Sequence, residues 1–130
     1  MDIIELAGYG KVKQLIQSAQ AGDANAQYNL GVLYFDGKDV TQNYMEAAKW
    51  YSCAADQGDR QAQFNLGLMC YRGLGIPKNF VYAYELFSLA AEQGDERAKQ
   101  GMAAILVEAP AEQLAEINKL TSKKPDSTHH

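Results

Sequence analysis

Residues 23–58, DANAQYNLGVLYFDGKDVTQNYMEAAKWYSCAADQG, return in altered form as residues 59–94, DRQAQFNLGLMCYRGLGIPKNFVYAYELFSLAAEQG. The two stretches align without a gap, and 14 of the 36 positions are identical. Average residue usage would give about two or three identities by chance. The chain therefore contains a tandem duplication. A period of this length, made of two amphipathic helices, is typical of an α-solenoid, in which each unit buries its apolar face against its neighbours.

Each unit contains the end signals of two helices. An Asp opens the first helix and an Asn opens the second, because both side chains can accept hydrogen bonds from the free amides of a first turn. A glycine follows each helix, where a left-handed residue is favoured. In chain order these positions are Asp23, Gly37, Asn43, Gly58, Asp59, Gly73, Asn79 and Gly94.

The duplicated part is flanked by incomplete units. Residues 1–22 form an N-terminal half-repeat or cap, with a short helix over 3–7 that Gly8 and Gly10 interrupt and a second helix from Lys11. Residues 95–121 form a partial third repeat followed by a capping helix that begins near Pro110. Residues 122–130 are a polar tail ending in tag-like histidines. We expect an all-α fold of seven helices, or eight if the opening helix forms, without strands.

Two glycines lie inside predicted first helices, at Gly31 and Gly67. Glycine costs about 1 kcal/mol relative to alanine in a helix, so packing must compensate for it. We expect these glycines, together with the alanines of each unit, to let two helices approach closely. A Gly67→Val substitution should then cost several kcal/mol through overpacking.

Composition and charge exclude several classes of function. The chain has 47% hydrophobic and 22% charged residues, as an ordinary globular protein does, and its net charge is −4. That charge argues against nucleic acid and anionic membrane as partners. The first five residues, MDIIE, lack the basic and apolar regions of a secretory signal. We expect a cytoplasmic protein, or a periplasmic one if a signal has been removed.

The chemically reactive side chains are few. Cys53 and Cys70 fall several residues out of step when their helices are paired antiparallel, beyond the roughly 7 Å Cα limit for a disulfide, so we expect reduced thiols. No histidine precedes His129, and no metal-ligand cluster or nucleophile motif is present in the helical part. We therefore expect no catalytic residues, no metal and no cofactor.

The segment Ala24–Gly37, with the blocks AAKWY at 47–51 and AADQG at 54–58, resembles the Sel1-like repeat, a relative of the tetratricopeptide repeat, and the resemblance implies a bacterial protein. The resemblance extends from Lys11 to about Val107. It implies a right-handed α/α superhelix that acts in protein–protein interaction, with the first helices on the concave side. The second unit departs from the pattern, since Cys70 replaces the tyrosine found at Tyr34 and Leu86 replaces the tryptophan found at Trp50.

Some members of this family link each unit by a disulfide. The positions that their cysteines occupy are held here by Ala55 and Gln63, so the resemblance places this chain in the group without such disulfides.

One face of each first helix forms a stripe at spacing 3, 4, 3. The stripes are Asn25, Tyr28, Val32 and Phe35; Gln61, Phe64, Leu68 and Tyr71; and Arg97, Gln100, Ala104 and Val107. The family resemblance places them on the concave side, edged by Asn29, Asn65 and Arg72. We expect partner-binding residues at Asn25, Tyr28, Asn29, Val32, Phe35, Gln61, Phe64, Asn65, Leu68, Tyr71, Arg72, Arg97 and Gln100. The alternative is that the aromatic rings only pack between neighbouring helices.

These observations predict a non-enzymatic adaptor or regulator that binds a peptide or a segment of a partner protein. One alternative is an immunity-type inhibitor of a toxin enzyme, because a small acidic solenoid suits a basic target. Another is a solenoid that assembles with itself, through exposed aromatic residues at Tyr82 and Tyr84.

Overall fold

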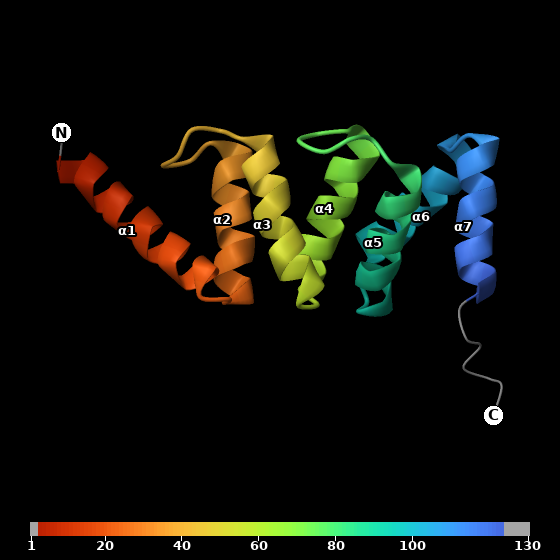
Figure 1. Ribbon diagram of the computed structural model, residues 1–130, viewed down its shortest axis with the longest axis horizontal. Helices are drawn as coiled ribbons and strands as arrows, with labels where there is room; N and C mark the ends of the chain where they lie inside the picture. Colours follow the sequence, from red (N-terminus) through yellow and green to blue (C-terminus); the bar gives the residue numbers. More distant parts are fainter. Residues whose placement is uncertain (1–2, 124–130) are drawn as a thin grey trace, which may run out of the picture.

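The computed structural model describes residues 3–123, and side chains over residues 10–122. Within that range the chain forms seven helices and no strand. They are α1 (Ile3–Gln20), α2 (Ala24–Asp36), α3 (Tyr44–Asp56), α4 (Arg60–Arg72), α5 (Phe80–Glu92), α6 (Glu96–Glu108) and α7 (Ala111–Lys123). The helices follow one another along the long axis of the molecule, with α1 and α7 at opposite ends (Figure 1). This is the α-solenoid that the duplication predicts.

The caps are those that the sequence signals predict. Asp23 accepts a hydrogen bond from the Ala26 amide at 2.9 Å, and Asn43 accepts one from the Glu46 amide at 3.0 Å. The second unit repeats both contacts through Asp59 and Asn79. Each cap satisfies an amide that the helix itself leaves free, so the four helices of the duplication begin where the sequence indicates.

The first helix differs from the prediction. Gly8 and Gly10 do not interrupt it, and α1 runs unbroken from Ile3 to Gln20. Neither glycine has a positive φ. Glycine keeps its backbone N–H, so it weakens a helix by about 1 kcal/mol without removing a hydrogen bond, whereas proline would remove one. The predicted separate helix over 3–7 is therefore the beginning of α1.

The core is built from small residues at the helix crossings and rings between them. Ala47, Ala54, Ala83 and Ala90 are fully buried, two in each second helix. A satellite cluster of Ala19, Ala26, Leu30 and Trp50 lies where α1 covers the first full unit. Without the N-terminal half-repeat, the side chains of Leu30 and Trp50 would be exposed to solvent, so α1 acts as a cap on the first unit.

The mid-helix glycines make room for rings. A Cβ added at Gly31 would lie 2.6 Å from the Tyr51 ring, and one at Gly67 would lie 2.7 Å from the Phe87 ring. Gly101 contacts the opposite edge of Phe87, where an added Cβ would lie 2.6 Å away. The sequence predicts a close approach of two helices at Gly31 and Gly67, and the structure shows instead that an aromatic side chain of the second helix fills the space at each glycine.

Glutamine side chains, of which Gln27 and Gln63 are buried, join one unit to the next. Gln27 donates to the Ala19 carbonyl at 3.0 Å, and Gln57 donates to the Gln27 side-chain oxygen at 2.8 Å and to the Gly22 carbonyl at 2.9 Å. Gln63 and Gln93 repeat this network one unit later. These bonds connect three consecutive helix ends and so fix how each unit sits on its neighbour.

The loop that follows the first helix packs against the preceding unit in the second unit only. Gly75 has φ of 75°, and a Cβ there would lie 2.8 Å from the Cβ of Tyr44 in the preceding unit. Asp39 occupies the same position in the first unit and has φ of 62°. It is exposed, since α1 continues as a helix through Gly8, the position that corresponds to Tyr44.

Candidate protein-binding face

Two hollows lie side by side on the face formed by α2, α4 and α6, which we call the first-helix face. The first hollow, between α2 and α4, has a volume of about 320 Å³. The second, between α4 and α6, has a volume of about 400 Å³. Leu68 and Arg72 of α4 line both hollows and form the ridge between them.

Ten of the thirteen predicted binding residues line these hollows. They are Tyr28, Val32, Phe35, Asn65, Leu68 and Arg72 in the first, with Phe64, Tyr71, Arg97 and Gln100 added by the second. The other three, Asn25, Asn29 and Gln61, are exposed and line neither. Val107, at the end of the third stripe, is 85% exposed and also lies outside them.

Pairs of aromatic rings form the floor of the face, and each pair occurs twice. Tyr28 packs on Tyr51 with ring centroids 5.8 Å apart, and Phe64 packs on Phe87 at 5.7 Å. Phe64 is only 8% exposed, so this ring belongs to the core. At that position the packing alternative describes the structure, whereas Tyr28, Val32, Phe35, Leu68 and Tyr71 are half-buried.

Six lining residues lie outside both the predicted stripes and their predicted edges: Asp36, Tyr51, Met69 and Leu74 in the first hollow, and Phe87 and Gly101 in the second. Tyr51 and Phe87 come from the second helices and reach the floor because Gly31, Gly67 and Gly101 leave space. A stripe drawn on first helices alone cannot include them.

The two hollows have chemically different floors. In the first, the Asn65 side chain hydrogen-bonds Tyr51, whose pKa is raised by burial. One unit later the tyrosine is Phe87, and Gly101 occupies the position that corresponds to Asn65. The hydroxyl and its amide partner are lost together, as expected when an unpaired buried polar group would be costly. The second hollow is thus the more apolar at its base.

The charged groups on this face are paired to different degrees. The Arg97 guanidinium donates to Asp95 at 2.9 Å and lies 4.1 Å from the centre of the Phe64 ring. The hydrogen bond from Arg97 lowers the pKa of Asp95 and raises that of Arg97. Among the described residues, Arg72 and Asp36 belong to no ion pair. The Arg97 guanidinium is therefore already paired within the chain, whereas no ion pair among the described residues uses the Arg72 guanidinium.

At the far edge of the second hollow, the Tyr71 hydroxyl donates to the Glu108 carboxylate at the end of α6. Tyr71 also packs edge-on against Phe80 with ring centroids 5.7 Å apart. Both contacts hold this ring as a wall between α4 and α6.

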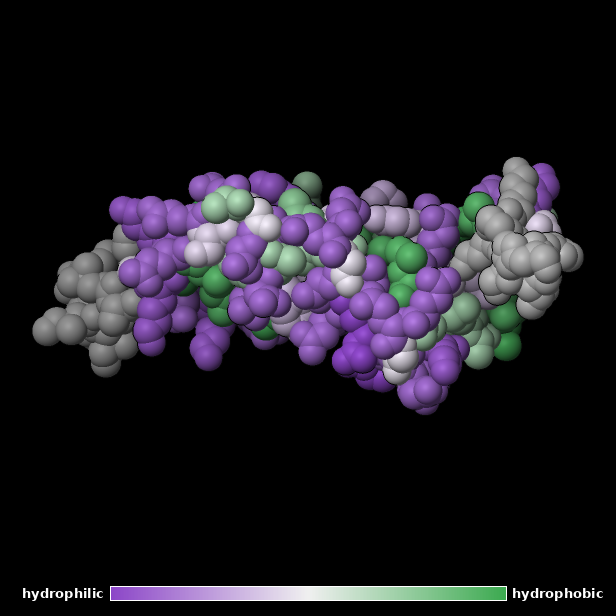
Figure 2. All heavy atoms as spheres, turned by 90° about the horizontal axis from the view of Figure 1, so that it is seen from below, coloured by the Kyte–Doolittle hydropathy of each residue, from purple (hydrophilic) through white to green (hydrophobic). Residues whose placement is uncertain are grey.

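Two further hollows lie away from this face. One, of about 260 Å³, lies between α5 and α7 and includes Leu89 and Leu120, which are 45% and 38% exposed. The other lies between α3 and α5 and is lined in part by Met45 and Tyr82. Tyr82 hydrogen-bonds Ser52 of α3 and is 37% exposed. In the view of Figure 2, hydrophobic residues form small separate groups on a mainly hydrophilic surface.

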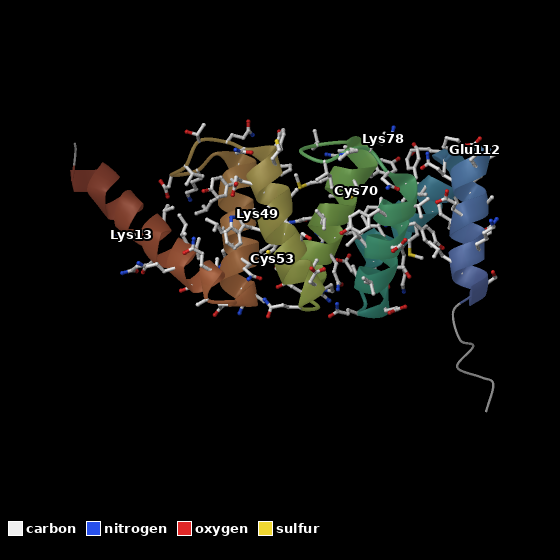
Figure 3. All side chains as sticks on the ribbon, in the orientation of Figure 1. Lys13, Lys49, Cys53, Cys70, Lys78 and Glu112 are labelled. Atoms are coloured by element: carbon white, nitrogen blue, oxygen red, sulfur yellow. The ribbon has the colours of Figure 1, made fainter. Side chains whose placement is uncertain are left out.

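The two cysteines differ in accessibility, since Cys53 is half-buried and Cys70 is buried. Cys53 on α3 and Cys70 on α4 lie at different heights in the solenoid and are both free (Figure 3). Cys70 is fully buried, and burial raises its pKa to about 12. Within residues 3–123 no cluster of potential metal ligands occurs and no helix is long and apolar enough to cross a membrane.

Comparison with known proteins identifies the repeat. The Sel1 repeat pattern matches residues 24–59 and 60–95, each one residue later than a duplicated unit. The chain belongs to the Sel1 repeat family. Proteins with such repeats are generally protein-interaction modules and typically non-catalytic. No curated protein matches the chain significantly.

Three solved structures are similar along much of the chain. A Sel1 repeat protein from Oxalobacter formigenes is 34% identical, with a TM-score of 0.69. The match covers 72% of this chain and 70% of that protein. Cysteine rich protein B of Helicobacter pylori is 30% identical, with a TM-score of 0.65, over 68% of this chain and 67% of that protein. The c5321 protein of uropathogenic Escherichia coli, a protective antigen with an SLR fold, is 31% identical with a TM-score of 0.77. That match covers 85% of this chain but only 24% of the antigen.

Proposed function

We propose that this chain is an adaptor or regulator that binds a segment of another protein on the first-helix face. The observation that carries the proposal is the pair of adjacent hollows, which open on one face and share the ridge of Leu68 and Arg72. Their walls combine half-buried apolar side chains with unpaired polar groups. That combination suits a polypeptide, whose side chains fill the hollows while its backbone and charges meet the rim.

The alternatives receive less support. Self-assembly through a stable dimer needs an interface of roughly 800 Å² from each partner, and Tyr82 is partly used inside the solenoid. No contact among the described residues favours a toxin enzyme over any other protein partner. The proposed face serves an inhibitor and an adaptor alike, so the partner decides between those roles.

The proposal is tested by two matched double variants. Val32→Ser with Leu68→Ser removes apolar surface from the first-helix face, and Leu89→Ser with Leu120→Ser removes it from the hollow between α5 and α7. Each variant and the wild type are immobilised, and proteins captured from a lysate of the source organism are compared by quantitative mass spectrometry. We expect the first variant to lose the specific partner and the second to retain it.

Melting temperatures of both variants provide the control for folding. Val32 and Leu68 are half-buried and Leu89 and Leu120 are exposed, so the first variant should lose more stability than the second, and capture is compared at a temperature at which both are folded. Retention of every specific partner by the folded Val32 and Leu68 variant would refute the proposed binding face.

A further inference from the structure

Two unpaired charges of opposite sign occupy the same position in the two full units. Asp36 is the last residue of α2, and Arg72 is the last residue of α4, one repeat later in the alignment. Both side chains are exposed, both line the first hollow, and neither belongs to an ion pair among the described residues. The first hollow therefore has a carboxylate and a guanidinium at its rim, above a floor whose polar groups, Tyr51 and Asn65, are hydrogen-bonded to each other.

The carboxylate is placed where it does not help the helix. The C-terminal end of a helix carries partial negative charge, so Arg72 stabilises α4 while Asp36 destabilises α2. Asp36 gains no compensating ion pair from the described residues. A stabilising partner for Asp36 is thus to be sought outside the described residues, in a basic side chain.

Other charges on the face are already satisfied. Arg97 is paired with Asp95, and Glu108 accepts a hydrogen bond from Tyr71. No carboxylate lines the second hollow, whereas Arg72 lines both. Along the direction from α2 to α6, the free features of the face are thus an acid, an apolar hollow, a base and a second apolar hollow.

The spacing of these features suits an extended peptide. Packed helices lie about 8–10 Å apart, and three residues of a polyproline II segment rise about 9.3 Å. Because polyproline II has three residues per turn, side chains three positions apart also point in the same direction. In such a segment that crosses α4, residues three positions apart can therefore contact the same feature, a charged side chain or a hollow, in two successive units.

We propose, building on the proposed function, that the first-helix face selects an extended segment with a basic residue and an acidic residue three positions apart. The basic side chain pairs with Asp36 and the acidic one with Arg72. Apolar side chains, also three positions apart, enter the two hollows on either side of the Leu68 ridge. The net charge of −4 does not decide this selection, because salt screens exposed charges beyond about 8 Å.

Three synthetic peptides test the proposal. They carry the cores Lys-Leu-Pro-Glu-Leu-Pro, Lys-Leu-Pro-Lys-Leu-Pro and Glu-Leu-Pro-Glu-Leu-Pro between identical Gly-Ser flanks, with blocked ends and a fluorophore. Their apolar framework is constant, so only the charges at two positions differ. Binding is followed by fluorescence anisotropy and by amide chemical shifts in labelled protein, which detect weak complexes and show which face is used.

The wild type should bind the Lys–Glu peptide about fivefold more tightly than either of the others, which is the upper range for an exposed ion pair. Arg72→Asp should shift the preference to the Lys–Lys peptide, and Asp36→Arg should shift it to the Glu–Glu peptide. Arg60→Asp, which makes the same charge change at the exposed start of α4, should leave the wild-type preference in place. Each variant is first checked for an unchanged helical spectrum.

The outcomes separate this inference from the proposed function. Equal binding of all three peptides at the two hollows would overturn the charge selection while supporting the face itself. The inference would also be overturned if no peptide shifted the amide signals of the first-helix face. In that case the capture experiment with the Val32 and Leu68 variant would still test whether this face binds a protein partner. Preferences that follow Arg60→Asp as strongly as Arg72→Asp would attribute the effect to net charge and overturn it as well.

Discussion

Replacing Gly67 with alanine should destabilise the solenoid, although alanine is the better helix former. The added Cβ would lie 2.7 Å from one edge of the Phe87 ring. The ring cannot move away, because its other edge already lies against the backbone of Gly101 in α6, where an added Cβ would lie only 2.6 Å from the ring. Phe87 is 1% exposed and joins three helices, so relief would require α4 or α6 to shift.

The magnitude follows from two opposing effects. Overpacking a close-packed core costs about 1–3 kcal/mol, and contacts below 3 Å on both sides of one ring place this site toward the upper end. Helix propensity returns about 1 kcal/mol. The free energy of unfolding should therefore fall by about 2 kcal/mol, which corresponds to roughly 5–10 °C in melting temperature for a chain of this length.

A matched control lies in α1. Gly10→Ala is the same substitution inside a helix, but nothing lies within 4 Å of the added Cβ, so it should raise the free energy of unfolding by up to about 1 kcal/mol. Both variants are measured by urea denaturation followed by circular dichroism. A Gly67→Ala protein at least as stable as wild type would refute the account of the ring contact.

A double-mutant cycle makes the test specific. Phe87→Leu removes the edge that the new methyl group meets, so Gly67→Ala should cost less in that background than in the wild type. The coupling free energy should be about 1 kcal/mol or more, as for residues in direct contact. A coupling near zero would mean that Gly67 acts through the backbone and not through Phe87.

Three further predictions concern the polar and reactive groups. Gln63→Leu should lower the free energy of unfolding by about 1–3 kcal/mol, because the Ala55 carbonyl and the Gln93 amide each lose a partner, whereas Gln61→Leu on the exposed side should stay within about 0.5 kcal/mol in the same urea titration. The folded-state pKa of Asp95 lies below its ordinary value of 3.8, so its ionised form stabilises the fold at higher pH and this contribution is lost as the pH falls below about 4. Asp95→Asn should accordingly flatten the acid side of a plot of melting temperature against pH, and an unchanged acid limb would contradict the assignment. The Cys53 thiol should react with a disulfide reagent in the native protein while Cys70 reacts only after denaturation, because Cys70 is fully buried with a pKa of about 12; two rapidly reacting thiols in native protein would show that α4 opens.

Much of the fold could be predicted from the duplication because its signals are local. An N-cap needs one side chain three residues before an amide, as at Asp23 and Asn43, and the sequence displays that spacing directly. The continuity of α1 could not be predicted in this way. Two glycines weaken a helix without ending it, so its persistence depends on the residues around them and on packing against the next unit.

The sequence predicts which residues share the candidate face but not how deeply each side chain is buried. Helical periodicity identifies Val32, Leu68 and Tyr71 as one surface, but it does not show how far each side chain sinks. Phe64 lies on the same stripe and is nonetheless in the core, because Gly67 and Gly101 draw Phe87 beneath it and Arg97 covers it from above. Asp36 could have been found from sequence, since it occupies the position of Arg72 in the duplicated alignment.

The loop residues Asp39 and Gly75 determine how longer arrays can be built from this chain. A unit added before the first one in the same geometry would place its second helix against residue 39, where a side chain would meet the incoming backbone as it would at residue 75. Copies of the second unit, which carries glycine at this position, can follow one another without that collision. Polymers designed from this repeat should therefore use residues 59–94 as the internal module and keep residues 23–58 for the leading end.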